Sequence, residues 1–192
     1  MIHLMTVSCI KMITQTKCLS YLETLLEPGR FQDYCPNGLQ VAGKEQIDTL
    51  MTGVTASQDL IDAALDMRAD AILVHHGFFW RGEDPRIIGI KQRRLKQLLI
   101  NDINLIVYHL PLDAHPTLGN NAQLARLLGL ESDSMILGTG EPAIGLSGHF
   151  SSPKTMPEFV SELNQSLGRT PLVIKGHDRP MKTIGWCTGA AQ

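Results

Sequence analysis

A strand–helix–strand pattern between residues 47 and 74 constrains the fold more than any other part of this sequence. Residues 47–54 have the composition of a strand, and Ser57 stands where the N-cap of a following helix is expected. Apolar residues then recur at helical spacing, and the uninterrupted apolar run 71–74 predicts a buried second strand. Because two strands joined by a helix pair in parallel with a right-handed crossover, the pattern predicts an α/β fold.

Further signals extend this fold on both sides. Residues 34–41 predict a turn leading into a short strand, and Thr155 with Glu158 matches a capping box. Together they predict a mostly parallel or mixed sheet with flanking helices. The predicted helices cover residues 14–27, 90–100, 120–128 and 155–167, and the other predicted strands cover 103–108, 172–174 and 183–187.

The sequence predicts two parts. Residues 1–130 form an N-terminal α/β domain that carries the candidate site, and residues 131–192 form a second, smaller α/β subdomain. The sequence stops where the last strand runs into Gly189 and small residues, a point at which a helix normally follows. We therefore expect the second part to be incomplete at its C-terminus, because an unpaired terminal element leaves apolar surface uncovered.

Composition narrows the class of protein. Hydrophobic residues make up 43% and charged residues 19%, which suits a globular protein with a substantial core. The net charge of -2 lacks the basic bias of a nucleic-acid-binding protein. The 4 cysteines form no CxxC pair, which argues against a zinc ribbon or a disulfide scaffold. With no signal-peptide pattern and no apolar run of about 18 residues, we expect a cytoplasmic protein without a membrane span.

The apolar run 71–74 leads directly into His75 and His76. Ligands collect beyond the carboxyl ends of strands in open parallel sheets, and imidazole is the commonest metal ligand. The pair therefore either begins a metal site or consists of loop histidines with ordinary hydrogen bonds. Adjacent strand residues point to opposite faces, so either the pair sits at the strand's frayed end and serves one site, or each histidine binds a different metal ion. An aromatic run, residues 78–80, follows the histidine pair. We interpret these side chains as a hydrophobic plug that packs under the loop, rather than as rings that stack on a substrate.

A second loop rich in ligand-type residues follows the strand at 103–108. It contains His109, Asp113 and His115, and Pro116 biases His115 towards an extended conformation that makes it the weaker candidate. Together with the histidine pair, these side chains form a nitrogen and oxygen set that suits zinc, manganese, iron or nickel rather than calcium. The repetition of strand, ligand-bearing loop and helix strengthens the hypothesis of a metal site.

Other polar features have simpler explanations. His149 and His177 lie in turn-rich regions with no carboxylate at ligand spacing, which favours surface positions. The helix at 90–100 turns a basic face outward, with phosphate or anion binding as the alternative to a merely solvated face. That face carries Lys91, Arg93, Arg94 and Lys96.

Several motifs, in this order along the chain, resemble the family of GTP cyclohydrolase 1 type 2 homologues, also called the NIF-three-like family. The motifs cover residues 33–43, 52–57, 73–80, 108–116, 119–121 and 185–189. The resemblance implies a dinuclear metal centre with His75, His76 and Asp113 as metal ligands, and His109 as an auxiliary residue beside them. It also implies two divalent ions in a complete site.

The resemblance carries further expectations. The family's remaining ligands, in a His-x-x-x-Glu segment near its C-terminus, have no counterpart here, so we expect a truncated chain with a half-built site. A hydrolase-like activity on a nucleotide or another phosphate-bearing heterocycle is implied, with metal-activated water as the nucleophile. Ring-like homo-oligomers are also implied. The alternative is a non-catalytic metal-binding or regulatory module, or an inactive truncated member.

Overall fold

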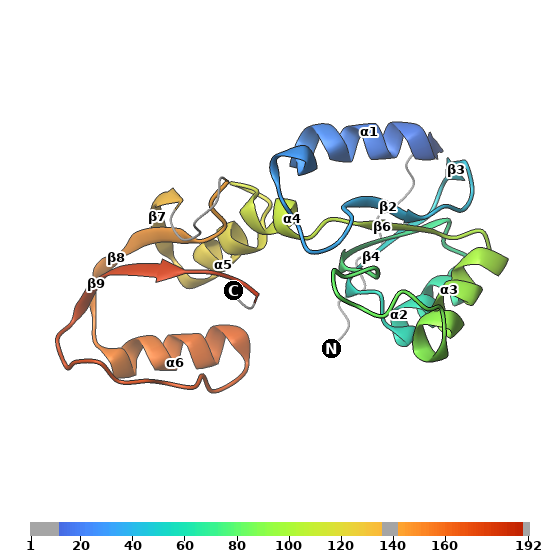
Figure 1. The fold of residues 1–192 in the computed structure, drawn as a ribbon. Helices are drawn as coiled ribbons and strands as arrows, with labels where there is room; N and C mark the ends of the chain where they lie inside the picture. The colour runs from blue at the N-terminus through green and yellow to red at the C-terminus, as the bar shows by residue number, and fades with distance from the viewer. Residues whose placement is uncertain (1–11, 136–141, 190–192) are drawn as a thin grey trace. The chain divides into compact units, whose positions relative to one another are not determined.

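The computed structural model describes residues 12–135 and 142–189. The chain divides into two compact units, Met1–Pro111 and Leu112–Gln192. Both combine strands with helices (Figure 1), which confirms the predicted α/β class. The first unit carries the histidine pair, and the second carries Asp113.

The first unit is built on a four-stranded mixed sheet in the order β2-β6-β5-β4. Its strands are β2 (Gly38–Val41), β4 (Leu50–Thr55), β5 (Ala71–His76) and β6 (Asn104–Val107). β4, β5 and β6 are parallel, and β2 joins β6 in antiparallel orientation. The strand predicted over 47–54 is split, because β3 (Gln46–Ile47) pairs instead with β1 (Ile13–Thr14) before β4 begins.

Helices cover both faces of this sheet (Figure 1), with α1 (Gln15–Leu26) on one face and α2 (Gln58–Asp66) and α3 (Gly89–Ile100) on the other. A short 3₁₀ helix, η1 (Pro28–Arg30), follows α1. Ser57 caps α2, as predicted, by accepting a hydrogen bond from the Leu60 amide at 3.2 Å. Helices on both faces explain why all four residues of β6 are buried.

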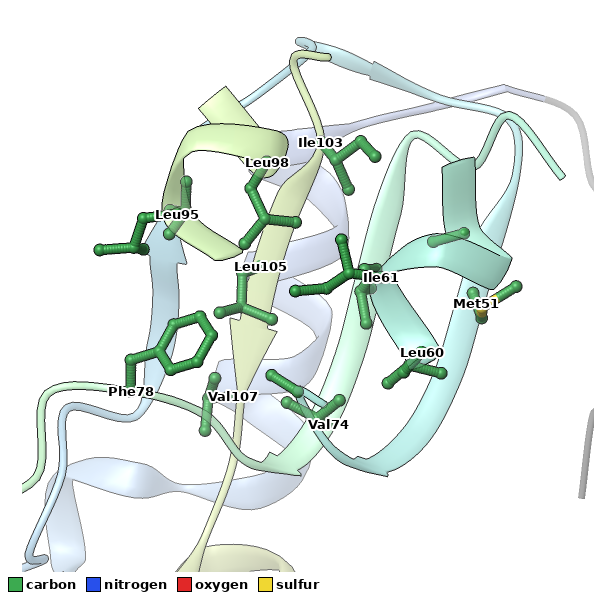
Figure 2. Close-up of a cluster of buried hydrophobic side chains, with 14 of the residues drawn as sticks. Met51, Leu60, Ile61, Val74, Phe78, Leu95, Leu98, Ile103, Leu105 and Val107 are labelled. Carbon is green, nitrogen blue, oxygen red and sulfur yellow. The ribbon is translucent and has the colours of Figure 1, made fainter. Parts of the chain in front are cut away.

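The two faces of β6 differ in chemistry. Leu105 and Val107 belong to the main apolar cluster, which Figure 2 shows with side chains from α2 and α3. On the opposite face, the fully buried amide of Asn104 accepts from Gln15 at 2.5 Å, and the Tyr108 hydroxyl donates to Glu23 at 3.1 Å. These polar contacts anchor α1 to the sheet, since buried polar groups require partners.

The second unit contains an antiparallel sheet in the order β7-β8-β9. Its strands are β7 (Leu130–Met135), β8 (Leu146–Lys154) and β9 (Met181–Trp186), and its helices include α5 (Asn120–Leu128) and α6 (Met156–Leu167). A small core of buried residues joins α5 to the sheet: Ala125, Leu130, Phe150 and Trp186. The capping box of Thr155 and Glu158 is confirmed at the start of α6.

Two sequence-based expectations differ from the structure. Residues 172–174 form no strand, and Leu172 and Ile174 are 91% and 88% exposed, so no neighbouring strand covers them. The stretch expected as a loop after β6 contains a helix, α4 (Leu110–Ala114).

The two units meet in the sequence between Pro111 and Leu112, earlier than the domain boundary predicted at residue 130. The difference concerns α5, whose residues Leu124, Ala125 and Leu128 pack into the core of the second unit. Helical periodicity alone does not reveal which sheet a helix packs against. In the described ranges, no helix has the length and apolar character needed to cross a membrane.

Candidate metal centre

His75 and His76 are the last residues of β5, where that strand extends past its neighbour β6. The register between β5 and β6 ends with Val74 opposite Val107, and beyond that point His76 is paired only with Thr55 of β4. With no strand beside them on the β6 side, the two rings lie close together, with centroids 4.4 Å apart. This is the strand-end position that the pair needs to serve one site.

His109, two residues after β6, brings a third imidazole to the same edge of the sheet. Its ring centroid lies 4.9 Å from that of His75 and 5.7 Å from that of His76. Each of the three residues offers one ring nitrogen, and these nitrogens lie within 4.8 Å of one another. Three converging imidazole nitrogens suit zinc and similar transition metals, so the donor set fits a divalent ion.

The orientation of His75 is fixed by the neighbouring strand. Its Nδ1 lies 3.1 Å from the backbone carbonyl oxygen of Tyr108. Because a carbonyl can only accept, Nδ1 carries the proton, and the lone pair of the neutral ring is on Nε2. A backbone carbonyl that holds one ring nitrogen is the usual support of a metal-binding histidine. The side chain is buried, at 9% exposure, so its ring position is also set by packing.

A buried carboxylate supports His109 in the same way. Asp33 Oδ1 lies 2.7 Å from His109 Nδ1, and the Asp33 side chain is only 3% exposed. Burial alone would raise the pKa of Asp33, but hydrogen bonds from His109, Asn37 and the backbone amides of Leu110 and Tyr34 outweigh it and lower the pKa. The carboxylate is therefore ionised at neutral pH and holds the proton of His109 on Nδ1.

The sequence predicts that Asn37 and Gly38 set the backbone geometry of a turn, with a functional turn near a pocket as the alternative, and it assigns no separate role to Asp33. Asn37 links Asp33 to the backbone of His109. Its Nδ2 donates to Asp33 at 2.9 Å, and its Oδ1 accepts from the His109 amide at 2.8 Å. The available signal was the Asn-Gly turn, in which Gly38 adopts a φ of 93° that favours glycine. This turn places the Asn37 amide beside the end of β6.

A second group of potential ligands shares His109 and consists of Asp33, Cys35 and His109. Burial, followed by the charge of Asp33, raises the pKa of the Cys35 thiol to about 12. A thiol with such a pKa stays protonated at neutral pH, and the protonated form is a poor ligand. The three-histidine group is therefore the stronger candidate of the two.

The loop after the histidines is packed too tightly for any residue but glycine at position 77. A Cβ there would lie 2.4 Å from both Gln40 Oε1 and Val107 Cγ2. Gln40 needs this position, because its Oε1 accepts from the Phe78 amide at 2.7 Å. Phe78 and Trp80 pack against the main core, as the plug interpretation predicted, whereas Phe79 is 37% exposed.

Trp80 also contacts the histidine cluster directly. Its ring meets that of His109 edge-on, at 4.9 Å between centroids and an angle of 90°. Its indole Nε1 donates to the Gly77 carbonyl at 3.2 Å, which holds the ring in place. Trp80 therefore forms one apolar wall beside the candidate ligands.

Asp113 is a buried carboxylate of the second unit, with 4% exposure. Its Oδ1 accepts from Asn120 Nδ2 at 2.8 Å and from the Thr188 hydroxyl at 3.1 Å. Asn121 donates to the Asp113 backbone carbonyl and accepts from the Thr188 amide at 2.6 Å. The second unit thus assembles two of the sequence motifs, 119–121 and 185–189, around Asp113, while the first unit brings together His75, His76 and His109.

The other histidines have different surroundings. His115 Nδ1 accepts from the amides of Thr117 and Leu118 at 3.3 and 3.1 Å, which stabilises a turn. His177 is exposed, as predicted. His149 is also at the surface, with its side chain 42% exposed.

The expected surroundings of His149 are wrong in one respect. It lies within β8, and two carboxylates of β7 flank its ring, Glu131 at 3.1 Å and Asp133 at 3.0 Å. Antiparallel pairing places Glu131 directly opposite His149, a proximity that residue spacing in the sequence does not reveal.

These features define an α/β protein with a candidate metal centre at the carboxyl edge of its parallel strands. The model of the family Duf34/NIF3 (NGG1p interacting factor 3) matches residues 13–192. The chain belongs to this family, which confirms the resemblance seen in its sequence motifs.

Curated relatives agree with this assignment. Proteins named GTP cyclohydrolase 1 type 2 homolog are 51% identical over 167 residues in Pseudomonas aeruginosa and 50% identical over 173 residues in Vibrio cholerae. These alignments cover 87% and 89% of this chain, but 66% and 68% of the relatives. The chain therefore spans about two thirds of the length of the curated relatives it matches.

Solved structures share the fold. The protein ybgI, described as of unknown function, is 45% identical with a TM-score of 0.87, and the match covers 93% of this chain and 70% of that one. The protein TTHA1606 from Thermus thermophilus is 34% identical with a TM-score of 0.75, covering 88% of this chain and 69% of that one.

Proposed function

We propose that this protein binds divalent metal ions through His75, His76 and Asp113, and acts as a metal-dependent hydrolase on a nucleotide or another phosphate-bearing heterocycle. The observation that carries the proposal is the three-histidine cluster, whose ring nitrogens lie within 4.8 Å of one another. The name of the relatives, GTP cyclohydrolase 1 type 2 homolog, supplies the substrate class. Two ions in a complete site, and zinc, manganese, iron or nickel as their identity, belong to the same proposal.

A bound divalent ion would supply a hydroxide nucleophile near neutral pH by acidifying water. The residues of this chain hold the ligands in position for it. The Tyr108 carbonyl directs His75, and ionised Asp33 fixes the proton of His109 on Nδ1. His109 acts in this proposal as an auxiliary residue beside the ligands, and Trp80 limits water on one side of its ring.

Metal analysis of the purified chain tests the first half of the proposal. We expect stoichiometric zinc or manganese in the unsubstituted protein, and loss of bound metal in His75→Ala and His76→Ala. His177→Ala is the matched control, because His177 is an exposed histidine outside the cluster. Equal metal content in all four proteins would contradict the proposed ligands.

Enzyme assays test the second half of the proposal, the metal-dependent hydrolase activity. We expect release of formate from GTP, or hydrolysis of a model phosphoester, in the presence of added Mn²⁺ or Zn²⁺, and its loss in His75→Ala. Bound metal without turnover would instead favour the non-catalytic module. A homo-oligomeric ring and a cytoplasmic location stay predictions, the first of which light scattering after size-exclusion chromatography would check.

A further inference from the structure

A pocket of about 580 Å³ lies in the first unit between the start of α2 and one side of α3. We call it the α2–α3 pocket. Its polar lining consists of three amide side chains and three cationic ones: Gln58, Gln92, Gln97, Arg93, Arg94 and Lys96. The histidine cluster contributes none of these residues.

The three cations of the pocket are not neutralised by the protein. Within residues 12–135 and 142–189, Arg93, Arg94 and Lys96 form no ion pair, whereas Lys91 on the same helix pairs with Glu83 at 3.1 Å. A carboxylate beside the lining amides, that of Asp62, accepts from Gln58 at 2.8 Å and from Gln97 at 3.4 Å. Asp62 thus accepts hydrogen bonds from the two amides and forms no ion pair with Arg93, Arg94 or Lys96 among the described residues.

Arg94 has a further feature that points to a missing acceptor. Its Nε is covered by protein and has no hydrogen-bond partner in the part of the chain that the structure describes. A covered N–H without an acceptor costs free energy, and natural structures contain few of them. An anion that draws the guanidinium into a bidentate contact would supply the acceptor.

The N-terminus of α2 also contributes positive electrostatic potential to the pocket. Gln58 is the first residue of this helix, which runs from Gln58 to Asp66 and is capped by Ser57. Helix N-termini carry partial positive charge and expose amide donors, so they favour anions, phosphate groups above all.

We propose that the α2–α3 pocket binds a small polyphosphate anion, such as the triphosphate group of a nucleotide or free inorganic triphosphate. Arg93 to Lys96 span about one turn, or about 5 Å, of helix, which matches a short phosphate chain. A nucleic acid strand would need an extended basic surface, whereas the three cations of this pocket lie within about one turn of α3. The inference stands apart from the proposed metal site, since none of its residues belongs to that cluster.

Calorimetric titration of the full chain with inorganic triphosphate tests this site. Chelator treatment beforehand removes metal, so that coordination of phosphate to a bound ion cannot contribute. At low salt, where screening is weak, we expect saturable binding that Arg93→Gln/Arg94→Gln weakens about tenfold or more. Lys17→Gln, which removes an exposed cation from α1 of the same unit, should leave the affinity unchanged.

The remaining measurements distinguish loss of triphosphate binding from misfolding of the variant, from binding at the histidine cluster and from binding of a nucleic acid. Circular dichroism checks that the double variant folds, and Lys96→Gln, with a smaller expected loss of affinity, replaces it if it does not. The double variant should keep its metal content, which distinguishes this site from the histidine cluster. Absence of saturable binding, equal affinity in the variants, or binding of an oligonucleotide that triphosphate does not displace would overturn the proposal.

Discussion

The Nδ1 of His109 lies 2.7 Å from Oδ1 of Asp33, a residue 76 positions earlier in the chain. This contact joins the segment before β2 to a residue two positions after β6, and β2 and β6 are neighbours in the sheet. It gives one imidazole of the cluster a fixed orientation and a fixed tautomer.

Asp33→Asn should weaken metal binding, because the carboxylate that orients His109 is lost while the size of the side chain is kept. For a histidine that ligates a metal, loss of the supporting carboxylate typically lowers metal affinity about 10- to 100-fold, and for His109, beside the proposed ligands, this is the upper limit. Competition with a chromophoric chelator measures the affinity. Asp66→Asn, an exposed site at the end of α2, serves as the control. Unchanged affinity in Asp33→Asn would show that His109 takes no part in metal binding.

Gly77→Ala should destabilise the protein by about 1–3 kcal/mol, since the new methyl group meets Gln40 Oε1 and Val107 Cγ2 at 2.4 Å. The Gln40 contact to Phe78 should also be lost, which loosens the loop after the histidines. Urea denaturation measures the change. Gly29→Ala is the matched control, because a Cβ there has nothing within 4 Å. Equal destabilisation by both substitutions would contradict this explanation.

Asp70→Asn should destabilise the first unit by about 1–3 kcal/mol at neutral pH, because Asp70 accepts from Lys44 and from the Asp48 and Thr49 amides. Burial opposes ionisation of Asp70, but these hydrogen bonds outweigh it and lower its pKa. A lowered folded-state pKa gives stability that is present above the unfolded value of about 3.9 and lost as pH falls through the folded value.

Urea denaturation of both proteins at several pH values checks this linkage. The difference in unfolding free energy between the original chain and Asp70→Asn should narrow as the pH drops below about 4. A difference that stays constant down to acid pH would mean that the ionised carboxylate is not responsible.

His149 should titrate above its ordinary range because of its two carboxylate neighbours. The hydrogen bond to Asp133 and the charge of Asp133 raise its pKa most, burial lowers it by less, and Glu131 raises it further. A raised pKa gives stability that is present below the unfolded value of about 6.5 and lost as pH rises through the folded value. Histidine NMR titration should show the His149 pKa falling in Glu131→Gln/Asp133→Asn.

Much of the fold could be predicted from local signals. The helix cap at Ser57, the capping box at Thr155 and the alternation of strand and helix each depend on a few neighbouring residues, and each is confirmed. The position of His75 and His76 at the end of β5 follows from the apolar run before them. The predicted strand at 172–174 failed because apolar residues alone do not supply a partner strand.

The α/β class, the family and the place of the histidine pair could be predicted, because caps, periodicity and motifs depend on residues that are close in the chain. The contacts of Asp33 and Asn37 with His109, and of Glu131 and Asp133 with His149, arise from folding. These contacts depend on strand order and register, which are fixed by burial of both faces of a sheet at once. No local pattern in the chain specifies strand order and register. The partners of His109 and His149 could therefore not be predicted from the sequence.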